Sequence, residues 1–240
     1  MRVKIFVLVF ILFAVSNLRA QNLQPDSFLY SKAASQAIDC FNNFIANESE
    51  INNGPVYEFY PPANKGSFYF QDKNYCIPGL VRYNGNWYKN IPLLYDSYND
   101  IMISTLNNNL FVLNTEKIAD VYLLNHHFIH INQSGDELAP GFYDVIYNGH
   151  SQVLIKRTKF IDEHAVEGQA LQTFYEDRSN AYIKKGTQYY LVDTRGSFLD
   201  TFKDKKKDLN RYMRDNKIDY KKDKESAVAK LAAYYDSINN

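Results

Sequence analysis

Between Gly66 and Phe160, short runs of alternating apolar and polar residues follow one another, each ended by a turn-forming sequence. Alternation with a period of two is typical of a β-strand that buries one face. Asn84-Gly85 and Asn148-Gly149 each separate two such runs, and Asn-Gly favours a hairpin because it tolerates positive φ at both turn positions. The pattern predicts a mainly β fold, an antiparallel meander that closes toward a barrel or a curled sheet.

Helical spacing replaces the alternation on both sides of the meander. Residues 27–47 place apolar side chains three or four positions apart, which predicts an N-terminal amphipathic helix. From residue 197 the same spacing appears twice, interrupted at 219–222, and predicts a C-terminal helical pair that packs on the β domain. The apolar positions of the pair include Leu209, Tyr212, Met213, Val228, Leu231 and Tyr235.

The first 20 residues have the three parts of a secretory signal peptide. Arg2 and Lys4 precede an apolar stretch over 5–15, and a small-residue cleavage site follows before Gln21. The apolar stretch is too short to span a bilayer, and an uncleaved signal anchor is the alternative. We therefore expect an exported protein, periplasmic, extracellular or associated with the outer membrane, and not an integral membrane protein. The expected parts are the signal peptide 1–20, an N-terminal helix and link 21–53, a β domain 54–196 and a helical segment 197–240.

Charge and cysteine content narrow the class of protein further. After signal removal, 24 basic and 27 acidic residues give a net charge of −3, whereas residues 200–240 alone carry 11 basic and 8 acidic side chains. No groove-reading motif accompanies this basic segment, so we expect no nucleic-acid binding. Cys40 and Cys76 are the two cysteines. In an oxidising compartment we expect them to form a disulfide, and two buried thiols are the alternative.

Several segments carry a resemblance to known sequences. They are Gly54 to Tyr95, with Val81-Arg82-Tyr83-Asn84-Gly85 and Asn90-Ile91-Pro92-Leu93-Leu94-Tyr95-Asp96 near its end, then Gly141-Phe142-Tyr143-Asp144-Val145-Ile146-Tyr147-Asn148-Gly149, and Lys205 to Ser237. In these segments the chain resembles uncharacterised exported envelope proteins of Gram-negative bacteria. The resemblance covers most of the mature chain and implies one folded unit, but no activity or site residue.

Three histidines, His126, His127 and His130, suggest metal chemistry at first sight. On a helix, His126 and His130 would share a face and suit zinc. The run alternates, however, and on a strand positions four apart lie about 13 Å from each other, too far to share an ion. We therefore expect no metal and no cofactor, unless neighbouring strands supply further ligands.

Sequence motifs for catalysis are also lacking. The acidic cluster of Asp162, Glu163, His164 and Glu167 does not have the spacing of a zinc protease, and neither a nucleophile elbow nor a phosphate loop occurs. Paired carboxylates of a glycoside hydrolase would come from distant strands and leave no local signature. A hydrolase with dispersed carboxylates is therefore an alternative, not the first interpretation.

Aromatic and basic side chains provide the candidate binding residues. The chain has 20 Tyr and 16 Phe, and aromatic sheet faces can stack on sugar rings, although aromatics also fill cores. The candidates are Trp87, Tyr88, Tyr95 and Tyr98 beside tight turns, and Lys205, Lys206, Lys221 and Lys222 on the basic helical side. We expect a non-catalytic envelope protein that binds another protein or supports a surface assembly. A β-cavity protein for a small apolar or glycan ligand is the second interpretation.

Overall fold

The computed structural model describes residues 32, 36, 50–59, 65–132, 138–165 and 172–239. Lys32 and Gln36 are helical. The rest of the predicted N-terminal helix, the predicted signal peptide, Cys40 and Glu167 lie outside the described residues. Within the described part, no helix has the length and apolar character needed to cross a membrane.

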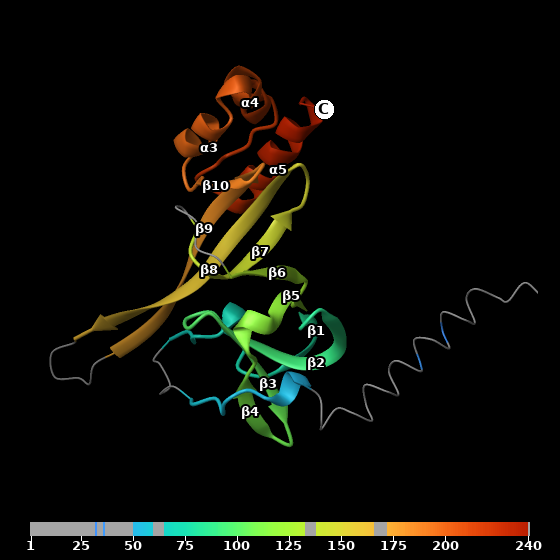
Figure 1. Cartoon of the computed structure of the whole chain (residues 1–240). Coiled ribbons are helices and arrows are strands. Elements are labelled where there is room, and N and C mark those ends of the chain that lie inside the picture. The colour runs from blue at the N-terminus through green and yellow to red at the C-terminus, as the bar shows by residue number, and fades with distance from the viewer. Residues whose placement is uncertain are drawn as a thin grey trace, which may run out of the picture. The chain divides into compact units, whose positions relative to one another are not determined.

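Ten antiparallel strands form one sheet in the described part of the chain (Figure 1). The order across the sheet is β10-β9-β8-β7-β6-β5-β1-β2-β3-β4, so strands that follow each other in sequence are neighbours except for β4 and β5. The strands are β1 (Ile77–Tyr83), β2 (Asn86–Asp96), β3 (Ile101–Leu106), β4 (Asn109–Val112), β5 (Ile118–Leu123), β6 (His126–Ile131), β7 (Gly141–Tyr147), β8 (Ser151–His164), β9 (Gln172–Lys185) and β10 (Gln188–Leu191). The predicted mainly β antiparallel meander is confirmed. It is open, with β4 and β10 at its ends, and does not close into a barrel.

Each of the two Asn-Gly pairs connects two paired strands, but the physical reason for glycine differs between the two connections. Asn84 and Gly85 have φ of 49° and 83° between β1 and β2, the left-handed conformation that this turn needs. Neither Asn148 nor Gly149 has positive φ between β7 and β8. Gly149 is needed there because a Cβ would collide with the Tyr147 hydroxyl and the Asp236 carboxylate.

Strands β8 and β9 are longer than the alternation indicates. Beyond Phe160 the sequence is compatible with a loop or a short helix, but β8 continues to His164 and pairs with β9 over its whole length. The far half of this hairpin curls back toward the end of β2, where the Lys159 N–H donates to the Ser97 carbonyl at 3.2 Å. The Tyr175 ring also packs on the ring of Phe68, with centroids 5.6 Å apart. These contacts, which local sequence does not encode, hold a polar segment in strand conformation.

One face of the sheet carries two apolar cores. The first core centres on β1, β2, β5 and β6 and includes Phe70 from the short 3-10 helix η2 (Phe70–Asp72). The second lies where three helices cover β8 and β9, namely α3 (Arg195–Thr201), α4 (Lys206–Asp215) and α5 (Lys224–Ser237), at the red end of the chain in Figure 1. The sheet contributes Val153, Ile155, Ala181 and Ile183 to this second core, and the helices contribute Phe198, Leu209, Val228 and Leu231 among others.

The helices begin where the sequence offers side-chain caps. Thr194 and Ser197 form a reciprocal capping box at α3, and Asp223 accepts the Ser226 N–H at the start of α5. The predicted C-terminal helical segment thus packs on the sheet, with its first half divided into α3 and α4 around Phe202 and the short 3-10 helix η4 (Lys203–Lys205).

Candidate functional site

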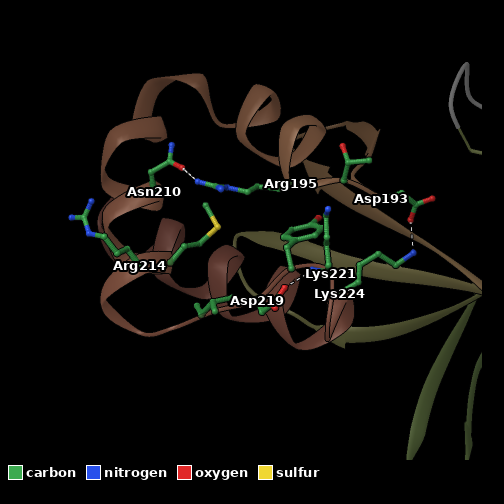
Figure 2. A pocket seen from close by; sticks show the side chains of 11 residues that line it. Asp193, Arg195, Asn210, Arg214, Asp219, Lys221 and Lys224 are labelled. Carbon is green, nitrogen blue, oxygen red and sulfur yellow. Dashed lines mark hydrogen bonds and ion pairs between the residues drawn. The ribbon is translucent and has the colours of Figure 1, made fainter.

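A half-open cleft of about 990 Å³ lies among the three C-terminal helices (Figure 2). It is bounded by the residues before and at the start of α3, by the second half of α4, by the α4–α5 connection and by the start of α5. The lining residues are Asp193, Thr194, Arg195, Asn210, Met213, Arg214, Ile218, Asp219, Tyr220, Lys221 and Lys224. A volume of this size suits a drug-sized ligand or a few residues of a peptide.

Part of the cleft lining is apolar and fixed in position. Met213 and Tyr220 are 5% and 7% exposed and belong to the core under the helices. The Tyr220 hydroxyl donates a hydrogen bond to the Val192 carbonyl, which ties the α4–α5 connection to the end of the sheet. Burial, together with the nearby Asp193 charge, raises the pKa of Tyr220, so this hydroxyl stays protonated at neutral pH.

One cation of the cleft is neutralised by a carboxylate. Lys224 Nζ lies 2.7 Å from Asp193 Oδ1, which also accepts the Ala181 backbone N–H at 2.8 Å, and Asn180 donates to the other oxygen. Partial burial alone would raise the pKa of Asp193, but the hydrogen bonds from Lys224, Ala181 and Asn180 hold it below its usual value. This arrangement fixes the start of α5 to β9 and leaves little net charge at that end of the cleft.

Two other cations have no carboxylate partner among the described residues. Arg195 Nη2 donates to the neutral amide oxygen of Asn210 at 2.5 Å. Lys221 Nζ, which also lines the cleft, forms no ion pair with any described residue. The Asp219 carboxylate instead accepts the backbone N–H groups of Lys221 and Lys222, at 2.9 and 3.2 Å. Figure 2 shows Arg195 extending from α3 toward α4 and Lys221 rising from the other wall. With Arg214 at the rim, the lining has four cations and two carboxylates, a net charge of +2.

The four lysines predicted as binding residues differ in their surroundings. Lys221 lines the cleft, and Lys222 is exposed beside it. Lys205 is half-buried, whereas Lys206 is exposed and pairs with Asp200 at 3.0 Å. The sequence therefore identified the basic segment but only one lysine of the cleft.

The four aromatic residues predicted to bind a ligand also lie in different environments. Trp87 is 44% exposed, whereas its neighbour Tyr88 packs on Tyr83 because successive side chains of a strand point to opposite faces. Tyr95 is only 1% exposed and its hydroxyl donates to Asp100 at 2.6 Å, so this candidate lies in the core. Tyr98, 38% exposed, lies in the turn beyond the other end of β2 from Trp87.

The histidines occupy strand β6, as the alternation predicts, and each has a separate environment. His126 Nδ1 lies 2.7 Å from Asp144 Oδ2, and its Nε2 lies 3.0 Å from the Gln71 amide nitrogen. His127 faces the other side, stacked on Tyr122. Burial lowers the pKa of His130. In the described ranges, no group of three or more His, Cys, Asp or Glu side chains is positioned to hold a metal ion.

Cys76 is half-buried beside the aromatic cluster of Tyr57, Phe68 and Tyr69, and burial raises the pKa of its thiol. Its predicted partner Cys40 lies outside the described residues. The disulfide therefore stays a prediction.

A buried ion-pair network that the sequence did not suggest connects the sheet to α5. Arg157 on β8 contacts Asp144 with Nε and Nη2, at 2.7 and 2.6 Å, and Glu225 with Nη1 and Nη2, at 3.0 and 2.8 Å. Burial alone would lower the pKa of Arg157, but Glu225 and Asp144 raise it. One signal was available: Arg157 has the same strand parity as the buried Val153 and Ile155, so its side chain must enter the core side of the sheet.

No family model, curated protein or solved structure matches this chain. The site is therefore defined by its own geometry.

Proposed function

We propose that this chain is an exported, non-catalytic protein that binds another protein through the cleft among α3, α4 and α5. The observation that carries the proposal is the combination of a pre-formed cleft with an apolar floor and cations that lack carboxylate partners. Protein interfaces characteristically place an apolar centre inside a polar rim. Export is supported by the charged, apolar and small-residue order of the first 20 residues.

The chemistry of the lining supports binding over catalysis. Within the described residues, the cleft lining contains no histidine, serine or cysteine, the side chains that most often supply a base or a nucleophile. Among the described histidines that contact a carboxylate, His126 is engaged at both ring nitrogens by Asp144 and Gln71, and His127 contacts Asp120 and is stacked on Tyr122. A hydrolase with dispersed carboxylates is therefore a weaker proposal than a binding protein.

Site-specific photo-crosslinking tests the proposal. A benzoylphenylalanine at Arg214, whose side chain is 75% exposed at the rim, should capture a protein from the native compartment. The matched control places the same group at Lys89, which is exposed on β2. The adduct at position 214 should disappear when Arg195 and Lys221 are both changed to glutamine. Equal adducts at the two positions, or an adduct that the double substitution leaves intact, would contradict a role for the cleft.

Glycan binding on the opposite face of the sheet is a second candidate. The rings of Trp87 and Tyr122, 44% and 43% exposed, lie 6.1 Å apart beside the Arg82–Asp120 ion pair. Exposed aromatic rings next to charged groups can stack on sugar rings and bond their hydroxyls. Trp87→Ala should abolish any binding found in a glycan panel, and binding that survives this substitution would exclude the site. The β-cavity alternative has less support, since the first core fills the inner face with apolar side chains.

A further inference from the structure

We infer that the cleft recognises an acidic segment of its partner by holding one carboxylate between Arg195 and Lys221, with an adjacent apolar side chain on Met213, Ile218 and Tyr220. The inference rests on the proposed function and adds the chemical class of the ligand.

The charges define where the carboxylate binds. Arg195 has five N–H donors, of which the contact with Asn210 uses one and neutralises none of the charge. Lys221 rises from the opposite wall, as Figure 2 shows. No ion pair of Lys221 is found among the described residues. Two cations that line one cleft without carboxylate partners can both be stabilised by a bound anion. By contrast, Lys224 is satisfied by Asp193 and has no need of a ligand.

The remaining lining indicates a peptide rather than a polyanion. Asp193 and Asp219 also line the cleft, so a ligand with many negative charges would meet two carboxylates as well as the cations. The net charge of +2 fits a ligand with one or two negative groups. The buried Met213 and Tyr220 provide an apolar surface that a free inorganic anion would leave uncovered. An Asp or Glu next to a large apolar side chain uses both parts of the lining.

The cleft is pre-organised for this ligand. Asn210 orients the Arg195 guanidinium, and the Tyr220 hydroxyl and the Asp193–Lys224 pair fix two of the walls to the sheet. Groups that are already held in their binding geometry lose less side-chain entropy when the ligand binds.

The experiment measures fluorescence anisotropy of two labelled peptide amides on the mature chain, Gly-Leu-Asp-Phe-Leu-Gly and the same peptide with Asn for Asp. The Asp peptide should bind about tenfold more tightly, because a charge-assisted contact replaces a neutral one, and the difference should shrink as salt is raised. The double variant Arg195→Gln/Lys221→Gln should lose the difference. The matched variant Lys89→Gln/Lys230→Gln removes the same charge at exposed positions outside the cleft and should retain it.

Three results would overturn the inference. They are equal affinity for the two peptides, no binding of either peptide at millimolar concentration, and displacement by inorganic phosphate under conditions where acetate has no effect. The peptide experiment can fail without contradicting the proposed function. If position 214 still crosslinks a protein that depends on Arg195 and Lys221, protein binding stands and only the carboxylate recognition is wrong.

Discussion

Removing Arg157 should destabilise the protein more than removing any surface cation. The side chain is 16% exposed and is the cation that faces Asp144, whose side chain is 2% exposed. In Arg157→Met, the Asp144 carboxylate keeps its contact with His126 but loses its charge partner in a buried position. Breaking a buried ion pair from one side typically costs about 3–5 kcal/mol, most of it the penalty of the charge left behind. Glu225 is 32% exposed and can be rehydrated, so it should add little to that cost.

A second substitution that removes the unpaired Asp144 charge tests the size of this destabilisation. Asp144→Asn removes the stranded charge while an amide oxygen still accepts the His126 N–H. The double variant Arg157→Met/Asp144→Asn should therefore be about 1–3 kcal/mol more stable than Arg157→Met alone, since an uncompensated polar group is the larger loss. The control Lys89→Met changes an exposed cation and should stay within about 0.5 kcal/mol of the parent protein.

Urea unfolding followed by far-UV circular dichroism gives the free energy of unfolding for each variant. The non-additivity of the double variant isolates the interaction of the two side chains. The reasoning is refuted if Arg157→Met costs less than about 1 kcal/mol, or if the costs of the two substitutions simply add. Either result would mean that water already reaches Asp144 in the folded protein.

Further predictions concern the helical segment, acid stability and export. Leu231→Ala should lower the free energy of unfolding by about 2–5 kcal/mol, because Leu231 is a fully buried residue of α5 in the second core. An unchanged melting temperature would show that this segment does not stabilise the fold. Asp193 has a lowered pKa in the folded state, so its contribution to stability is present above about pH 4 and is lost as pH falls through the folded-state pKa. The Asp193→Asn variant should thus have a lower free energy of unfolding near neutral pH, and its stability should fall less steeply with pH below about pH 4. A fall in stability below that pH identical to that of the parent protein would contradict this. Intact-mass measurement of exported protein should give a chain that begins at Gln21, whereas retention of Met1 would rule out cleavage.

The sequence by itself determined the class of fold, because the information lies in neighbouring residues. Alternation forces successive side chains onto opposite faces, and Asn84-Gly85 supplies the positive φ that reverses the chain. The spacing of Leu209, Met213, Val228 and Leu231 likewise encoded helices with one buried side. These features depend on local backbone geometry, and the tertiary contacts are compatible with it.

Tertiary structure decided which strands continue, whether the sheet closes and where the site lies. The polar end of β8 becomes a strand because β9 and the backbone of Ser97 supply its hydrogen bonds, and no short window contains these partners. Tyr95 and Trp87 are indistinguishable as aromatic strand residues, yet one is in the core and the other is exposed. The cleft combines Arg195, Asn210 and Lys221 from three separate segments. Its charge and shape arise only when those segments pack together, since binding chemistry depends on distances in space that a linear pattern does not encode.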